Sequence, residues 1–235
     1  MHRLQQSLAC LALALLIHLP AQAAASLERL QLAACRTTSS FLLLRGEGQQ
    51  SAFDDLPAPL RERLLPPYQH LLERLDTGQT YGPREDDLPW QYPEQLSRAL
   101  VTLLEQAEAM PKSPRPSALH SAVKLEYFAA LYAGQAYLGY FDITPTPDAR
   151  YPNQSGEQLL ASLDQEMRQH LPRLAQGGPE QARKAQAEWR YLRAALADFD
   201  SAGRARLGHS GKPLVPLVVS RYSRNLSERL LTLAD

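Results

Sequence analysis

Residues 117–139 read SALHSAVKLEYFAALYAGQAYLG, and apolar or aromatic side chains occupy nearly the whole circumference of a helix built from them. A helix that lies on a protein surface has one apolar face and one polar face, whereas a helix that is apolar on all sides is enclosed by neighbours. We therefore expect residues 117–139 to form the central helix of an all-α protein. The remaining chain must supply the helices that cover it.

The segments before and after residues 117–139 have the spacing of apolar residues that helices packed around a central helix require. Apolar residues recur at intervals of three and four positions, which is the period of an amphipathic helix, within residues 26–45, 67–77, 93–110, 155–174, 179–199 and 214–235. Ser155 and Gln158 have the spacing of a capping box and predict where one of these helices starts. The sequence predicts an antiparallel bundle of six to seven amphipathic helices around the central apolar helix, without strands.

Prolines and glycines predict where the helices end. Proline lacks the amide donor and clashes with the preceding turn, so Pro66 and Pro67 predict a break after a short helical segment. A new helix then opens at Pro67 and is stopped by Gly78. The proline-rich residues 111–116 predict a stiff, extended connector and the one internal hinge of the domain.

The first 23 residues have the layout of a bacterial secretory signal peptide. A basic start at His2 and Arg3 leads into the apolar run 8–19, and the small residues that follow form an A-x-A cleavage site ending at Ala23. The apolar run is about 12 residues long, whereas a membrane-spanning helix needs roughly 20. We expect cleavage near Ala23, no stable membrane anchor afterwards, and a periplasmic or secreted protein whose residues 24–235 form a single helical domain.

The net charge limits which partners are expected, and the cysteine content limits which disulfides can form. Removal of residues 1–23 leaves 24 Lys plus Arg against 25 Asp plus Glu, so neither nucleic acid nor an anionic membrane is an expected partner. Cys35 is then the only cysteine, which excludes an internal disulfide. The thiol is either buried, paired between chains or reactive, and its place on the inner side of the first helix favours burial.

Catalytic and metal-binding motifs are absent from the sequence. Helical metal sites need ligands that share one face, such as His-x-x-x-His or Glu-x-x-His, and neither pattern occurs. The nearest pair, Glu166 and His170, lies at the edge of an apolar stripe and is interpreted as an exposed hydrogen-bonded pair. No Gly-x-Ser-x-Gly nucleophile motif is present. The sequence thus predicts no metal and no cofactor, and favours a non-enzymatic protein.

One set of residues suggests a binding site. His120, Lys124 and Glu126 lie within the apolar central helix, where an unpaired charge costs several kcal/mol. They must form ion pairs that fix the helix register, or face a polar cleft that holds an anionic or sugar-like ligand. Aromatic and arginine side chains of the last two helices are their candidate partners. The predicted binding residues are His120, Lys124, Glu126, Tyr127, Trp189, Arg190, Arg193, Arg221, Tyr222 and Arg224.

Three functions are compatible with these patterns. The favoured hypothesis is an exported, non-enzymatic module that binds a partner protein or a small ligand in a groove around the central helix. The second is a cell-envelope hydrolase or lyase in which Glu126 acts as general acid or base, with His120 or an arginine holding the reacting group. The third is an envelope assembly or accessory factor that acts as a homodimer, with Cys35 as a candidate link.

Overall fold

The computed structural model describes residues 23–43, 51–81, 88–110, 117–139, 141, 143–146, 148–199 and 215–233. Residues 1–22 of the predicted signal peptide and the predicted connector 111–116 lie outside this range. Within it no residue is in a strand, and no helix is both long and apolar enough to cross a membrane. The all-α prediction is confirmed.

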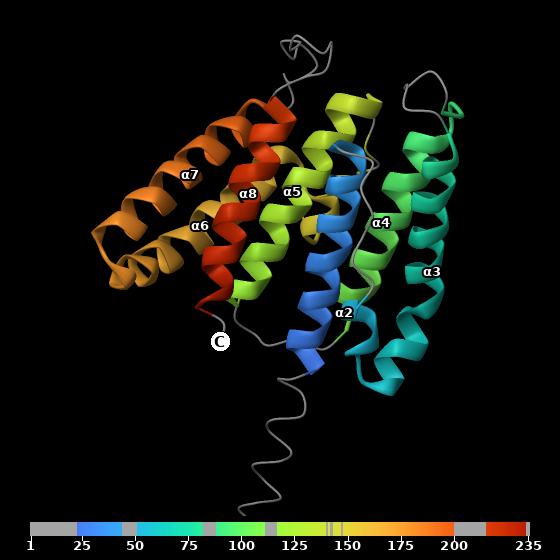
Figure 1. The fold of residues 1–235 in the computed structure, drawn as a ribbon, viewed down its shortest axis with the longest axis horizontal. Helices are drawn as coiled ribbons and strands as arrows, with labels where there is room; N and C mark the ends of the chain where they lie inside the picture. Colours follow the sequence, from blue (N-terminus) through green and yellow to red (C-terminus); the bar gives the residue numbers. More distant parts are fainter. Residues whose placement is uncertain are drawn as a thin grey trace, which may run out of the picture.

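Seven helices of 17 or more residues make up most of the described chain (Figure 1). The first spans 23–43 and is the unlabelled blue helix of Figure 1. The others, together with short helical elements, are α2 (Ser51–Asp54), α3 (Ala58–Thr80), α4 (Tyr92–Glu108), α5 (Ala118–Leu138), η2 (Tyr151–Asn153), α6 (Gly156–Leu174), η3 (Ala175–Gly177), α7 (Pro179–Ala197) and α8 (Val215–Leu231). This number agrees with the six to seven helices that the sequence predicts.

Helix α5 is the enclosed centre of the bundle, as its composition predicts. Of its 21 residues 17 are buried, and α8 packs along it while helix 23–43 lies on its other side (Figure 1). The Ser117 hydroxyl caps its start by accepting from the His120 amide, and Gly139, with φ of 67°, ends it in a left-handed conformation. The burial of α5 on all sides explains its lack of a polar face.

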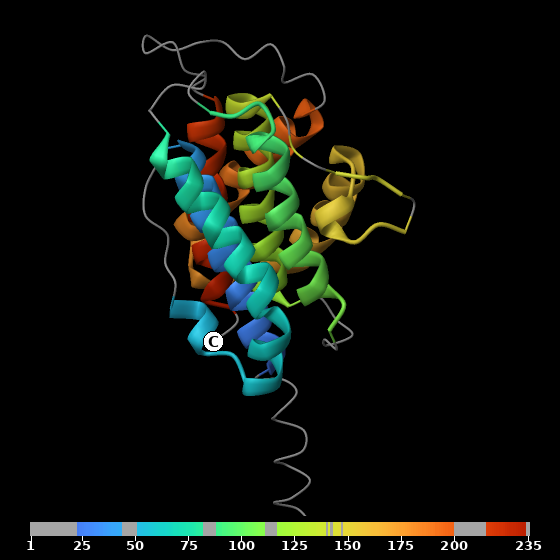
Figure 2. The same cartoon turned by 90° about the vertical axis from the view of Figure 1, so that its right-hand side faces the viewer.

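The remaining helices pair on the two flanks of this centre. Helices α3 and α4 pack on each other, and Figure 2 shows them side by side on one flank. On the other flank α6 packs on α7, and α7 packs on α8. The predicted capping box of Ser155 and Gln158 opens α6. The two flanks therefore leave α5, α8 and helix 23–43 in the middle.

The predicted break at Pro66 and Pro67 is wrong, because α3 runs through both residues without interruption. Leu64, Pro67 and Tyr68 are buried on one face of α3. Burial of that face against the core offsets the backbone hydrogen bonds that the prolines remove. Gly78 likewise lies inside α3 rather than at its end.

Gly78 is required by a close approach between α3 and α4. The Tyr92 hydroxyl donates to the Arg74 carbonyl at 2.9 Å and lies directly over Gly78. A Cβ atom at Gly78 would lie 2.5 Å from Phe41 Cζ and closer still to the Tyr92 hydroxyl. Both rings are buried, with 1% exposure. Glycine at this position therefore lets three helices meet.

We expect Gly78→Ala to lower the free energy of unfolding by about 1–3 kcal/mol, because the two buried rings must shift to admit the methyl group. Gly177→Ala is the matched control, since a Cβ there would meet only the Gln181 side chain at 3.9 Å, and we expect a change below about 0.5 kcal/mol. Urea denaturation followed by circular dichroism measures both. Equal effects of the two substitutions would contradict the close approach.

Candidate functional site

A fully buried carboxylate, that of Glu126 in α5, joins three helices. Its Oε1 atom accepts from Arg36 Nε at 3.0 Å, from Arg224 Nε at 2.7 Å and from the Ser227 hydroxyl at 2.6 Å. Arg36 also donates to Ser227 Oγ at 2.9 Å and pairs with Glu228 Oε1 at 2.7 Å. We call these five residues the Glu126 cluster. It links helix 23–43, α5 and α8.

The Glu126 cluster shapes the electrostatics of the core around it. Glu126 has no exposed side-chain area, and its Oε2 atom has no hydrogen-bond partner in the described part of the chain. Burial raises the pKa of the neighbouring Cys35 thiol well above its ordinary value; the Glu126 charge adds to this effect and Arg36 opposes it. Cys35 is a free, buried thiol, as its helix position predicts. A protonated thiol of this kind is unreactive.

A second buried polar cluster joins α5 to α6. Glu166 Oε1 pairs with Lys124 Nζ at 2.5 Å, and Glu166 Oε2 accepts from the Ser121 hydroxyl at 2.6 Å. His170 Nε2 lies 3.1 Å from the same Ser121 oxygen. We call these four residues the Glu166 cluster. The interpretation of Glu166 and His170 as an exposed pair is wrong, because they are only 6% and 3% exposed and face α5.

The geometry of the Glu166 cluster assigns the proton on His170. Since the Ser121 hydroxyl donates to Glu166, His170 Nε2 must carry the proton that it shares with Ser121. His170 Nδ1 is buried and has no hydrogen-bond partner among the described residues, so a second proton there would be unsatisfied. Burial lowers the pKa of His170, Glu166 opposes this shift, and Arg173 adds to it. His170 therefore contributes to the fold as a neutral imidazole.

His120 belongs to a third polar region, between helix 23–43 and α4. Its Nδ1 atom lies 3.9 Å from Glu28 Oε1 and 4.0 Å from Glu108 Oε1. The Ser117 hydroxyl donates to Glu28 at 2.7 Å, and Gln31 donates to Glu108 at 2.9 Å. Among the residues that the structure covers, no group of three or more His, Cys, Asp or Glu side chains is arranged to hold a metal ion.

The structure does not bring the ten predicted binding residues together in one groove. His120, Lys124 and Glu126 belong to three separate polar regions of α5. Tyr127 is core, with its hydroxyl donating to the Pro152 carbonyl at 2.5 Å, and the Trp189 side chain is also buried. The ring of Tyr222 lies 4.9 Å from that of Tyr191.

Of the four arginines proposed as partners, only Arg224 reaches Glu126. Arg190, Arg193 and Arg221 are exposed, and Arg193 pairs with Asp164 at 3.4 Å instead. The sequence did not single out Arg36, the second partner of Glu126, because it lies on the first helix, 90 residues away from Glu126 in the chain. A signal was present, since Arg36 adjoins the buried Cys35 on the first helix.

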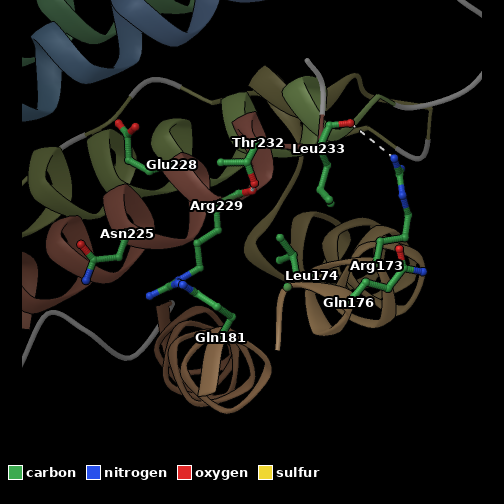
Figure 3. Close-up of a pocket in the computed structure, with 10 residues that line it drawn as sticks. Arg173, Leu174, Gln176, Gln181, Asn225, Glu228, Arg229, Thr232 and Leu233 are labelled. Carbon is green, nitrogen blue, oxygen red and sulfur yellow. Dashed lines mark hydrogen bonds between the residues drawn. The ribbon is translucent and has the colours of Figure 1, made fainter. Parts of the chain in front are cut away.

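A cavity lies away from α5, where α6 and α8 end and α7 begins. It has a volume of about 750 Å³ and opens between the α6–α7 turn and the last turns of α8 (Figure 3). Its lining includes Arg173, Gln176, Gln181, Asn225, Arg229 and Thr232. None of these residues was predicted from the sequence, because they come from helix ends that approach only in the folded chain. We call this cavity the α6–α8 pocket.

Comparison of the chain with models of protein families, with curated protein sequences and with solved structures finds no match.

We expect Arg224→Met to destabilise the protein by about 2 kcal/mol, less than the roughly 3–5 kcal/mol of a fully broken buried pair, because Arg36 remains on Glu126. Arg221→Met is the matched control, since Arg221 is exposed on the same helix. Its effect should stay within about 0.5 kcal/mol. Chemical denaturation compares the two. Equal losses would show that the Glu126 cluster does not hold α8.

We expect the stability of the protein to fall with pH below the ordinary His170 pKa of 6.5. The folded-state pKa of His170 is lowered, so the unfolded chain binds the proton first and stability is lost as pH falls, at no more than about 1.4 kcal/mol per pH unit. Unfolding free energies between pH 4.5 and 8 should show a shallower acid slope in His170→Gln. His70→Gln is the control, because the His70 side chain is 53% exposed. An unchanged slope in His170→Gln would contradict the neutral assignment.

Proposed function

We propose that the protein is an exported, non-enzymatic helical module that binds a small ligand or a segment of a partner protein in the α6–α8 pocket. The observation that carries this proposal is the pocket itself. Its volume of about 750 Å³ lies within the roughly 300–1,000 Å³ typical of ligand sites. Arginine, amide and hydroxyl groups line it together with Leu174 and Leu233.

The polar groups of α5 support a structural role for the central helix. They favour a binding site that lies away from it. Glu126 and Lys124 are each paired with groups from neighbouring helices, at 2.7 Å and 2.5 Å in their shortest ion-pair contacts. A ligand at either place would have to displace an internal ion pair from the core, at a cost of several kcal/mol. The α6–α8 pocket needs no such displacement because it opens to solvent.

The proposed export rests on the sequence of residues 1–23, which has a basic start, an apolar run too short to span a membrane, and a small-residue cleavage site. Cleavage after Ala23 would leave residues 24–43 of the first helix in the mature protein. The N-terminal helix thus supplies Arg36 to the Glu126 cluster after processing.

The geometry gives less support to the two other functions. A general acid or base must come within hydrogen-bond reach of a substrate, whereas Glu126 is fully buried between two arginines. A dimer linked through Cys35 would need an accessible thiol, and Cys35 has 0% exposure. Both functions require the core to open around helix 23–43.

A thermal-shift panel of monosaccharides, dipeptides, dicarboxylates and phosphomonoesters tests the proposed function. A compound at ten times its Kd stabilises the folded protein by about 1.4 kcal/mol, which raises Tm by roughly 3–6 °C for a chain of this size. Gln176→Trp, which fills the pocket, should abolish the shift. Gln186→Trp, an exposed change on α7 outside the pocket, should retain it. Shifts that persist in Gln176→Trp, or a panel without any shift, would reject the pocket as the binding site.

A further inference from the structure

Some charged side chains of the α6–α8 pocket form ion pairs and one does not. Arg229 Nε pairs with Glu188 Oε2 at 3.1 Å, and the Glu228 carboxylate pairs with Arg36. Arg173 contacts only the carbonyl oxygen of Leu233, at 3.3 Å, and has no carboxylate partner within the described ranges. Figure 3 shows its guanidinium group at the edge of the pocket. The pocket therefore holds one positive charge that is not neutralised by a side chain.

Uncharged groups of the pocket also have hydrogen-bond donors without partners. Arg229 Nη1 donates to Gln181 Oε1, so the acceptor of this amide is used and its NH₂ group is left over. Asn225 makes no hydrogen bond within the part of the chain that the structure describes, so both its amide NH₂ and its amide oxygen are available. Helix α7 begins at the pocket without a side-chain cap, which leaves backbone amides of its first turn unpaired by side chains. The pocket thus has spare donors beside the Arg173 guanidinium, while its one carboxylate, Glu228, is paired with Arg36 and the Gln181 carbonyl accepts from Arg229.

The geometry points to an oxyanion, either a carboxylate or a phosphate monoester, as the group that the α6–α8 pocket binds, with the Arg173 guanidinium as its main contact. Such a group supplies acceptor oxygens for these donors and the negative charge that no described carboxylate provides to the Arg173 guanidinium. Guanidinium binds both anions through two parallel N–H donors. This inference rests on the proposed function and deepens it by naming the ligand chemistry.

The positions of these arginines at helix ends have a second explanation, which does not involve a ligand. The experiment must distinguish it from anion binding. Arg173 lies in the last turn of α6 and Arg229 in the last turn of α8. Cations are favourable there because the carboxyl end of a helix carries partial negative charge. An arginine that serves only the helix end would affect stability and leave ligand binding unchanged.

Isothermal titration of the mature chain with inorganic phosphate, with succinate and with neutral succinamide tests the inference. We expect phosphate, succinate or both to bind at low ionic strength, and succinamide to bind at least tenfold more weakly than succinate. Arg173→Gln should weaken anion binding at least tenfold. Arg168→Gln is the matched control, because Arg168 lies on the same helix, is 80% exposed and pairs with Asp164. It should change the affinity by less than twofold.

Each outcome decides the inference. Binding of phosphate alone or of succinate alone supports it and identifies the source of the oxyanion. Equal losses in Arg173→Gln and Arg168→Gln show unspecific attraction and overturn it, as does equal binding of succinate and succinamide. If only neutral compounds of the thermal-shift panel bind, and Gln176→Trp blocks them, the pocket stands as a binding site while the oxyanion is rejected. Circular dichroism melts show whether Arg173→Gln affects stability only.

Discussion

The structure depends on one buried charge, the carboxylate of Glu126 on the central helix. A lone charge in this position would cost several kcal/mol, which is comparable to the net stability of a small domain. The fold compensates it with Arg36 and Arg224, which approach from helix 23–43 and from α8. Since apolar packing alone tolerates small shifts of helix register, this pair of contacts fixes how α8 and the first helix lie against α5. Ser227 adds the hydrogen bond that completes the arrangement.

The Glu166 cluster fixes α6 against α5, as the Glu126 cluster fixes α8 against α5. Lys124 and Ser121 of α5 hold the buried Glu166 and His170 of α6. With α6 and α8 fixed independently on the same central helix, the ends of both helices and the start of α7 enclose a pocket that none of them forms alone (Figure 3). The polar groups of the core thus position the site, while the contacts available to a ligand belong to helix ends at the surface.

Much of the fold was predictable because local rules agree with the tertiary structure in most segments. The apolar composition of residues 117–139 and the capping box at Ser155 identify elements correctly. The failures occur where tertiary packing overrides a local preference. Pro66 stays within α3 because the buried face of that helix outweighs the lost hydrogen bonds, and Gly78 serves a contact with Tyr92 rather than a helix end. The site was less predictable, since the partner of Glu126 at Arg36 is 90 residues away in sequence.

The sequence by itself determined the helical class, the enclosed centre at residues 117–139 and the need for partners to the polar groups within it. The helical period and the cost of burying a charge are properties of each segment by itself. They can therefore be recognised from the order of residues alone. Only the tertiary structure decided which partners are used, that Glu166 and His170 face the core, and that the pocket lies between the ends of α6, α7 and α8. These depend on helix rotation and crossing, which arise from simultaneous packing of distant segments.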